Sequence, residues 1–357
     1  MPRSPLNRAL LLAHRWLGLA AAAFLLVLAG TGAVLLYQPE LERALQPALR
    51  HVIPGTQRVP LDSVVAAARR ANPGGQVRSI ALPEAADDAV RVRFGGVTAY
   101  VDPWRGTVLG LARPGRVVAR LRLLHRALLV EGRGLAVTRA ATWAAVLLTV
   151  GGLALWWRRR VWWLVRTGSW RGVVFDLHNV AGLLATPGIL LFAGTAALMS
   201  VSDVLDPLYR RVLGDAGPVP LAAPAPATGA TLPLDSLVRL ADAAVPGPVR
   251  EVRMPQGPAS PLQVLQQAPG QRGPRARNAT WIDPHDGRIR GVADQAARPL
   301  GSRLSAIIED WHVGGIPVPA ARAFGVASCA LLAFQVLSGT LVWWRPRRRQ
   351  EGREDEG

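Results

Sequence analysis

AHRWLGLAAAAFLLVLAGTGAVLL (residues 13–36) and LHNVAGLLATPGILLFAGTAALM (residues 177–199) decide the fold of this chain of 357 residues. The two stretches align without a gap, so that His14 matches His178 and Gly18 matches Gly182. Each is apolar over roughly the 20 residues that an α-helix needs to cross the hydrocarbon core of a bilayer. We therefore expect two membrane-spanning helices that are copies of one another.

Two further apolar runs, residues 140–157 and 323–344, contain no charged side chain, and each ends in Trp-Trp directly before an arginine. The composition agrees with a membrane protein, because 50% of the residues are hydrophobic, 18% are charged and the mean hydropathy is +0.20. The single cysteine excludes an internal disulfide and any cluster that needs several thiolates. The four predicted spans, with their helical flanks, cover residues 9–37, 134–157, 176–202 and 319–344.

The arginines indicate the orientation of the spans. The net charge is +18, and arginines crowd the N-terminus, the loop 158–175 and the tail 345–357. Short basic segments stay on the cytoplasmic side. We therefore expect a multi-pass protein of the inner (cytoplasmic) membrane with both termini in the cytoplasm and residues 38–119 and 203–300 in the periplasm. The positive charge is then a signal of topology, and nucleic-acid binding is not expected.

The two outer segments repeat one another as well. VPLDSVVAAARRANPGG (59–75) matches LPLDSLVRLADAAVPGP (232–248), and AYVDPWRGTVLG (99–110) matches TWIDPHDGRIRG (280–291). Each half of the chain is thus predicted to contain a span, an outer lobe, an interfacial amphipathic segment (120–133 or 301–318) and a second span. The fold class that follows is an all-α membrane four-helix bundle, tandemly duplicated, with two small α+β lobes outside the membrane. The two halves would be related by an axis along the membrane normal.

Within the first lobe the pattern predicts a helix over residues 61–71, with Asp62 or Ser63 as its N-cap. Extended runs follow at residues 89–94, 97–101 and 107–111. The Asp-Pro-x-x-Gly segments at Asp102 and Asp283 are typical of tight turns, and this interpretation is favoured over catalytic carboxylates. In the second lobe, residues 256–274 are rich in Pro, Gly and Gln and are predicted to form a loop.

Four of the six histidines occupy matching positions near the ends of spans. His14 and His178 are expected near the cytoplasmic face, and His125 and His312 near the outer face. Zinc normally takes three or four protein ligands, whereas haem iron takes two axial ligands that facing helices can supply. The pairs therefore predict two b-type haems, with these four histidines as iron ligands. No Cys-x-x-Cys-His motif is present to attach either haem covalently.

Other residues fit a haem site less specifically. Gly18 and Gly182 follow their histidines by four positions on the same helical face, where a small residue leaves room for a porphyrin or for a neighbouring helix. Arginines suited to the propionates are Arg15, Arg126 and Arg303. A single interfacial histidine more often only reaches toward water, and intramembrane histidines also serve as proton relays. The symmetric pairing favours haem, and His51 and His285, which have no histidine counterpart, are expected on the surface.

HRWLGL (14–19), VDPWRG (101–106), HNVAGLL (178–184) and the terminal WWRPR (343–347), in this order, resemble the PepSY-associated transmembrane helix family. These are bacterial inner-membrane proteins, often called iron-regulated membrane proteins. The family includes ferric-siderophore reductases that hold two haems through histidines of four helices. The resemblance thus implies the same ligand set in this chain, and lobes similar to the PepSY domain of protease propeptides.

The function expected is that of an electron-transfer protein, an oxidoreductase that carries electrons across the membrane to a periplasmic acceptor such as a ferric siderophore. No nicotinamide or flavin motif is present, so the electrons would come from a quinol or a separate reductase protein. Two other interpretations stay open. The lobes can be a non-enzymatic binding or regulatory module anchored by the spans, or the chain can be a cytochrome b subunit that relays electrons to another protein.

Overall fold

The computed structural model describes residues 5–113, 115–159, 162, 169–224, 230–257, 259–269, 277–315 and 320–344. The chain divides into two compact units, each made of several segments. The helical unit is drawn from Met1–Val34, Leu124–Ala197 and Ala323–Gly357, and the sheet unit from Leu35–Leu123 and Leu198–Arg322. The predicted cytoplasmic tail, residues 345–357, and part of the predicted loop 158–175, residues 160–161 and 163–168, lie outside the described residues.

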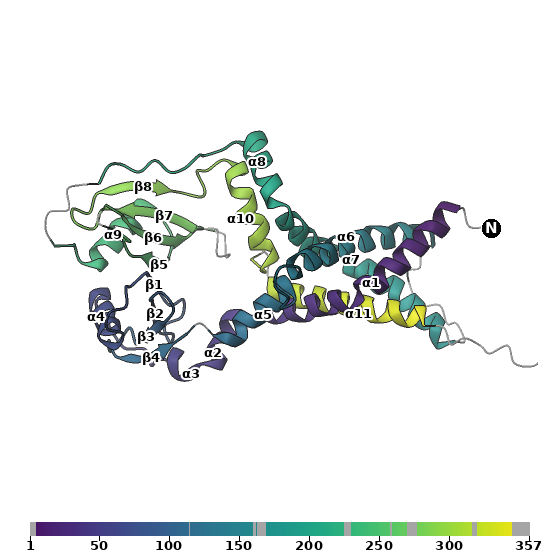
Figure 1. The fold of residues 1–357 in the computed structure, drawn as a ribbon, viewed down its shortest axis with the longest axis horizontal. Helices are drawn as coiled ribbons and strands as arrows, with labels where there is room; N and C mark the ends of the chain where they lie inside the picture. The colour runs from purple at the N-terminus through teal and green to yellow at the C-terminus, as the bar shows by residue number, and fades with distance from the viewer. Residues whose placement is uncertain are drawn as a thin grey trace, which may run out of the picture. The chain divides into compact units, whose positions relative to one another are not determined.

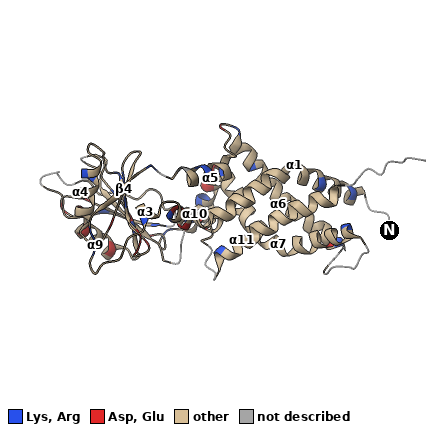
Figure 2. Cartoon of the chain, turned by 90° about the horizontal axis from the view of Figure 1, so that it is seen from below, with Lys and Arg blue, Asp and Glu red and all other residues tan. Residues whose placement is uncertain are grey.

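The helical unit contains four long helices, α1 (Pro5–Leu35), α6 (Gly134–Arg159), α7 (Trp170–Ser200) and α11 (Ala321–Trp343) (Figure 1). All four are long and apolar enough to cross a membrane. Figure 2 shows charged residues near their ends and almost none along their middle. Because a long apolar helix without charge is stable in lipid and not in water, the chain is a membrane protein.

Small residues bring these helices together. Ala21 and Leu25 of α1, Ala144 and Ala145 of α6 and Val336 of α11 belong to one buried cluster. Small side chains allow close approach of helix backbones, which is how helices associate in a membrane, where hydrophobic burial alone gives no driving force.

The sheet unit contains the same series of elements twice. The first half contributes α2 (Gln38–Leu45), α3 (Pro47–Arg50), α4 (Leu61–Ala71), β1 (Ser79–Ala81), β2 (Val90–Arg93), β3 (Thr98–Val101), β4 (Val108–Ala112) and most of α5 (Arg116–Ala127). The second half contributes α8 (Ser202–Leu213), α9 (Leu234–Ala244), β5 (Val249–Arg253), β6 (Leu262–Gln267), β7 (Arg277–Ile282), β8 (Ile289–Ala293) and α10 (Leu300–His312).

All eight strands form one antiparallel sheet, in the order β4-β3-β2-β1-β5-β6-β7-β8. The two halves meet where β1 pairs with β5, with Ile80 opposite Val252 and neither side chain exposed. The two predicted lobes thus contribute to one shared sheet. A four-stranded half would leave the backbone groups of β1 unpaired at an edge, and pairing with β5 satisfies them.

One face of the sheet is covered by the two equivalent helices, α4 and α9. Val64 of α4 and Leu237 of α9 pack with strand residues that include Val92, Val264 and Ile282, and each of these five side chains is at most 1% exposed. The core is thus continuous across the junction between the two halves.

The N-termini of α4 and α9 cap one another. The carboxylate of Asp62 accepts a hydrogen bond from the backbone N–H of Leu234, and that of Asp235 accepts one from the N–H of Leu61, both at 2.9 Å. The predicted helix 61–71 is confirmed, but the prediction that Asp62 or Ser63 caps it is wrong. Pro60 occupies the N-cap position of α4, and Asp62 stabilises the opposite helix instead.

The strands expected in the first half are present as β2, β3 and β4. The turn interpretation of Asp102 and Asp283 is confirmed, because each side chain accepts a hydrogen bond from the backbone N–H two residues further on, at 2.8 Å and 3.0 Å. The loop predicted for residues 256–274 is wrong in part, since β6 lies inside it and pairs with β7 along its whole length. Four of the six residues of β6 are buried despite the surrounding Pro and Gly, namely Leu262, Val264, Leu265 and Gln266.

Candidate functional site

His178 lies near the start of α7 and makes one well-defined polar contact. Its Nδ1 lies 2.9 Å from Oγ of Ser338 on α11. The same hydroxyl donates to the backbone carbonyl of Phe334 at 2.7 Å. A hydroxyl has a single proton, and a carbonyl can only accept, so the hydroxyl oxygen accepts from Nδ1–H of the imidazole. This tautomer leaves the lone pair on Nε2.

His125 in α5 has the same arrangement. Its Nδ1 lies 2.8 Å from Oγ1 of Thr31 in α1. That hydroxyl donates to the backbone carbonyl of Val27 at 2.6 Å. By the same argument His125 donates through Nδ1–H, and the lone pair is on Nε2.

A glycine follows each of these hydroxyl residues and faces the edge of the imidazole. A Cβ added at Gly339 would lie 3.2 Å from Cε1 of His178, and one added at Gly32 would lie 3.2 Å from Cε1 of His125. Few real Cβ contacts are this short, so a side chain at either position would push the ring away. The hydroxyl and the glycine together set the tautomer and the position of each ring.

His14 in α1 shares the glycine but lacks the hydroxyl. A Cβ added at Gly152 of α6 would lie 3.1 Å from Cε1 of His14. The preceding residue is Gly151, which by the sequence offset of the repeat corresponds to Ser338. Nδ1 of His14 is buried, and none of the described residues forms a hydrogen bond with it. The imidazole of His14 is therefore positioned by steric contacts, and its Nδ1 is an unsatisfied polar atom among the described residues.

His14 and His178 are both half-buried and lie within electrostatic range of one another. His125 is half-buried in the helical unit, while His312 is half-buried at the end of α10 in the sheet unit. The described residues contain no group of three or more His, Cys, Asp or Glu side chains arranged to hold a bare metal ion. Two imidazoles are the donor set of a haem iron, and the sharing of one iron by His14 and His178 stays a prediction.

The accessory residues named from the sequence have other contacts in the structure. Gly18 faces Leu148 of α6, and Gly182 faces Gln335 of α11, so both glycines allow close packing of helices. Their part in accommodating a porphyrin stays a prediction.

The three arginines expected at the propionates differ in their surroundings. The guanidinium of Arg15 lies over the rings of Trp16 and Trp343, at 5.8 Å and 5.7 Å from their centroids. Arg126 is exposed, and Nε of Arg303 is buried without a hydrogen bond to any described residue. Their pairing with propionates is untested and stays a prediction.

The two remaining histidines do not join the site. His51 is exposed and lies 3.7 Å from the carboxylate of Asp87. His285, expected on the surface, is half-buried in the turn after β7, where the carbonyl of Pro284 accepts a hydrogen bond from the N–H of Leu232.

Thr31, Ser338 and the glycines that follow them were not predicted from the sequence. A signal for part of this set was present. Gly151-Gly152 and Ser338-Gly339 align in the repeat, and each dipeptide lies in the span that follows the lobe. A small residue conserved between the two halves opposite a matched histidine would have indicated a contact with the ring.

The fold and these contacts define a membrane protein with four candidate spans, a separate α+β unit built on an antiparallel sheet, and histidines held between the long helices. The chain belongs to the family of the PepSY-associated TM region, which it matches over residues 11–346, nearly its whole length. No curated protein sequence matches the chain.

Proposed function

We propose that the chain is a di-haem b-type electron-transfer protein of the inner membrane, which passes electrons to a periplasmic acceptor. In this proposal His14 and His178 are the axial ligands of the haem nearer the cytoplasm, and His125 and His312 those of the outer haem. The acceptor proposed is a ferric siderophore, and the electron donor a quinol or a reductase protein.

The tautomer of two histidines carries the proposal. A histidine that binds a metal usually donates its other ring N–H to an oxygen acceptor, which fixes the ring and raises the basicity of the ligating nitrogen. Nδ1 of His178 lies 2.9 Å from the hydroxyl of Ser338, and Nδ1 of His125 lies 2.8 Å from that of Thr31. In this proposal each ring donates Nδ1–H to the hydroxyl, and the lone pair on Nε2 is the one that would bind iron. A histidine that only reaches toward water needs neither the hydroxyl nor the glycine beside its ring.

The proximity of His14 to His178 supports the inner site. Two neutral imidazoles gain little from facing one another in a membrane interior, and they repel when both are protonated. A shared iron gives both lone pairs a partner. The outer site rests on the repeat in the sequence and on the hydrogen bonding of His125 alone.

A bound haem would supply one-electron chemistry between its ferric and ferrous states. The part of the protein is to supply two neutral imidazoles per haem, to fix their orientation through Thr31 and Ser338, and to surround them with apolar helices that exclude water. Ferric iron is held much more strongly than ferrous iron by hard oxygen chelators, so delivery of one electron to a chelate favours release of the metal.

The proposed orientation rests on the distribution of arginine. The segments around residues 3–15 and 158–171 and the tail are rich in Arg, which favours the cytoplasmic side for both termini. The sheet unit would then lie in the periplasm. The reciprocal caps between α4 and α9 and the mirrored strand order of the sheet support a tandem duplication, and the cluster of small residues supports a four-helix bundle.

Haem content tests the proposal. The purified full chain is expected to contain two haems, with a Soret band that shifts on reduction and a pyridine haemochrome of the b type. Alanine at any of the four proposed ligands should remove one haem, and His51→Ala, which changes an exposed histidine outside the helical unit, should remove none. A chain that purifies without haem after expression with added haem precursor would leave the sheet unit as a tethered binding module.

A further inference from the structure

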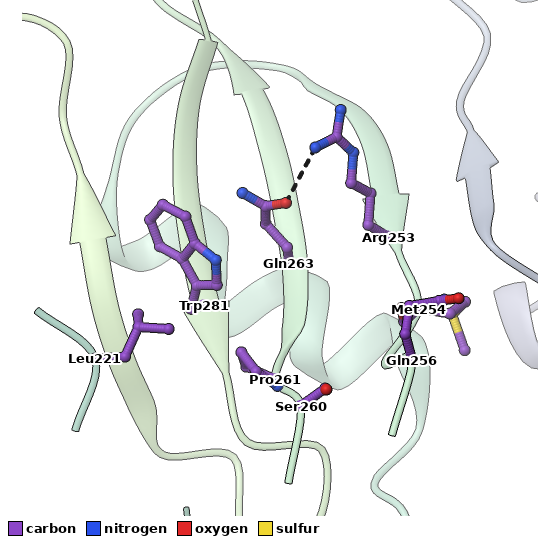
Figure 3. A pocket seen from close by; sticks show the side chains of 8 residues that line it. All are labelled: Leu221, Arg253, Met254, Gln256, Ser260, Pro261, Gln263 and Trp281. Carbon is purple, nitrogen blue, oxygen red and sulfur yellow. Dashed lines mark hydrogen bonds between the residues drawn. The ribbon is translucent and has the colours of Figure 1, made fainter. Parts of the chain in front are cut away.

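An open cavity lies on the sheet face opposite to α4 and α9, in the second half of the sheet unit. Arg253 of β5, Gln263 of β6 and Trp281 of β7 are direct neighbours in register across three strands. Their neighbours along the strands, Val252, Val264 and Ile282, point into the core under α9. The side chains of Arg253, Gln263 and Trp281 therefore point to the opposite face of the sheet. Figure 3 shows the guanidinium, the amide and the indole side by side.

The three residues line two adjoining spaces. One has a volume of about 270 Å³ and is closed on one side by Leu221. The other, of about 430 Å³, continues over Leu265 toward Arg277 and Arg298. Together they are in the size range of sites for small organic ligands. Every lining residue belongs to the sheet unit.

The polar part of this cavity is positively charged. Three arginines in or beside the cavity share the carboxylate of Glu251. This carboxylate lies 3.0 Å from Arg277, 3.1 Å from Arg93 and 3.9 Å from Arg253. One carboxylate thus faces three guanidinium groups. The Glu251 side chain is 10% exposed and the Arg253 side chain 54%, so a ligand meets the positive groups first.

Arg253 in particular keeps donors available. Its guanidinium donates one long hydrogen bond, 3.4 Å, to Oε1 of Gln263. A guanidinium has five N–H donors in a planar fork that suits carboxylates and other paired oxygens. Arg298 donates to the carbonyl of Gly217 and has Asp215 within electrostatic range, so it contributes less net charge.

The floor of the cavity is apolar. Leu265, Ala279 and Ala293 lie in neighbouring strands two residues beyond the Arg253-Gln263-Trp281 row, and each is at most 6% exposed. The ring of Trp281 is half-buried beside them. These aliphatic side chains and the neighbouring indole form an apolar surface on which a planar group can stack.

We propose that this cavity binds a small anionic ligand with a planar aromatic part, its oxygens on Arg253 and its ring against Trp281. The identity of the ligand rests on the proposed function. If that function holds, the ligand is the electron acceptor, an iron(III) chelate of aromatic dihydroxy groups with net negative charge. The arginines would favour it over a chelate with positive charge.

Binding of gallium(III) chelates to the full chain in detergent tests the site. Gallium(III) has the size and charge of iron(III) and is not reduced, so the result does not depend on haem or electron transfer. The tris(2,3-dihydroxybenzoate) complex is anionic and aromatic, and the desferrioxamine B complex is cationic and aliphatic. Calorimetry is expected to show binding of the first, weakened by added sodium chloride, and at least tenfold weaker binding of the second.

Variants assign that binding to the cavity. Arg253→Gln and Trp281→Leu should each weaken binding of the anionic complex at least tenfold, while Arg239→Gln, with the same loss of charge on the exposed side of α9, should leave it unchanged. Thermal unfolding shows whether each variant folds, and Trp281→Phe replaces Trp281→Leu if that one does not. Unchanged affinity in Arg253→Gln, or equal binding of the two complexes, overturns the proposal, as does absence of binding. Haem content, measured separately, reports on the proposed function.

Discussion

His14 and His178 occupy matching positions in α1 and α7, yet their surroundings differ by one hydroxyl. His178 donates to Ser338, whereas Nδ1 of His14 faces Gly151 and forms no hydrogen bond with the described residues. The glycines beside Cε1, Gly152 and Gly339, are retained in both halves. The difference separates two roles. The space for the ring is common to His14 and His178, and the hydroxyl that contacts Nδ1 is present only at His178.

The sheet unit shows a similar contrast. Each half buries one arginine among the described residues, Arg50 in the first and Arg290 in the second. Arg50 forms a two-pronged ion pair with Asp88, at 3.2 Å and 2.7 Å, while Arg290 donates to the carbonyls of Ala222 and Ala259. The fold is shared between the halves, and the polar details are not.

The largest effect is expected at the glycines that the two halves share. Gly152→Val and Gly339→Val should each abolish the inner haem, because the added side chain meets Cε1 of the histidine opposite. Gly194→Val in α7 is the matched control, since an added Cβ there would have no neighbour within 4 Å. Haem-to-protein ratios measure the outcome. Loss of haem in one glycine variant and not in the other would break the equivalence of the two sites.

The buried arginines should differ in their cost. Arg50→Met leaves the buried carboxylate of Asp88 without its cation and is expected to destabilise the sheet unit by about 3 kcal/mol. Arg290→Met removes hydrogen bonds to two carbonyls and should cost only about 1–2 kcal/mol. Guanidinium unfolding of the full chain in detergent, followed by tryptophan fluorescence, compares the two. Equal losses would mean that the ion pair with Asp88 contributes nothing beyond its hydrogen bonds.

The reciprocal caps should be equivalent. Asp62→Ala and Asp235→Ala each remove one carboxylate from the N-terminus of the opposite helix, and each is expected to cost about 1 kcal/mol. Ser63→Ala serves as the control and should change the free energy of unfolding by less than about 0.5 kcal/mol, because its side chain caps neither helix. The same unfolding titration applies. A larger cost for Ser63→Ala than for Asp62→Ala would show that α4 is capped locally.

The smallest effect is expected at Ser338, whose hydroxyl has no counterpart at the matched residue Gly151. Ser338→Ala should raise the midpoint potential of the inner haem by about 30 mV, which corresponds to about a threefold change in the equilibrium constant for its one-electron reduction. The reason is that a hydrogen bond from Nδ1–H makes the imidazole a better donor to ferric iron, and the variant removes this bond. Gly151→Ser, which supplies His14 with the missing acceptor, should lower it by a similar amount. A spectroscopic redox titration measures both. Shifts of the same sign would mean that these residues do not act through the hydrogen bond.

Much of the architecture could be predicted from the sequence. Residues 61–71, the turn at Asp102 and the four long helices follow from local periodicity, turn chemistry and the length of apolar runs. The joining of the two halves by β1 and β5 could not be predicted, because β1 has only three residues and its pattern is too short to read. The capping of one helix by the other depends on that same long-range contact.

The candidate site, too, could be predicted from the sequence only in part. The histidines are found by comparing the two halves of the sequence, because a repeat places matched residues around one axis. Ser338 could not be found so, because Gly151 occupies the matched position. Thr31 matches Thr195, but nothing in the sequence shows which histidine the hydroxyl of Thr31 contacts. A serine in an apolar helix is commonly bonded to its own backbone, and only the structure shows that the hydroxyl of Ser338 also accepts from His178.

The pairing of ligands is tested most directly by double variants. If His14 and His178 hold the same iron, His14→Ala, His178→Ala and the double variant with both changes should each contain one haem per chain. The combination of His14→Ala with His125→Ala removes a ligand from each proposed haem and should contain none. A His14→Ala, His178→Ala protein without haem, or a His14→Ala, His125→Ala protein that keeps one, would contradict the assignment.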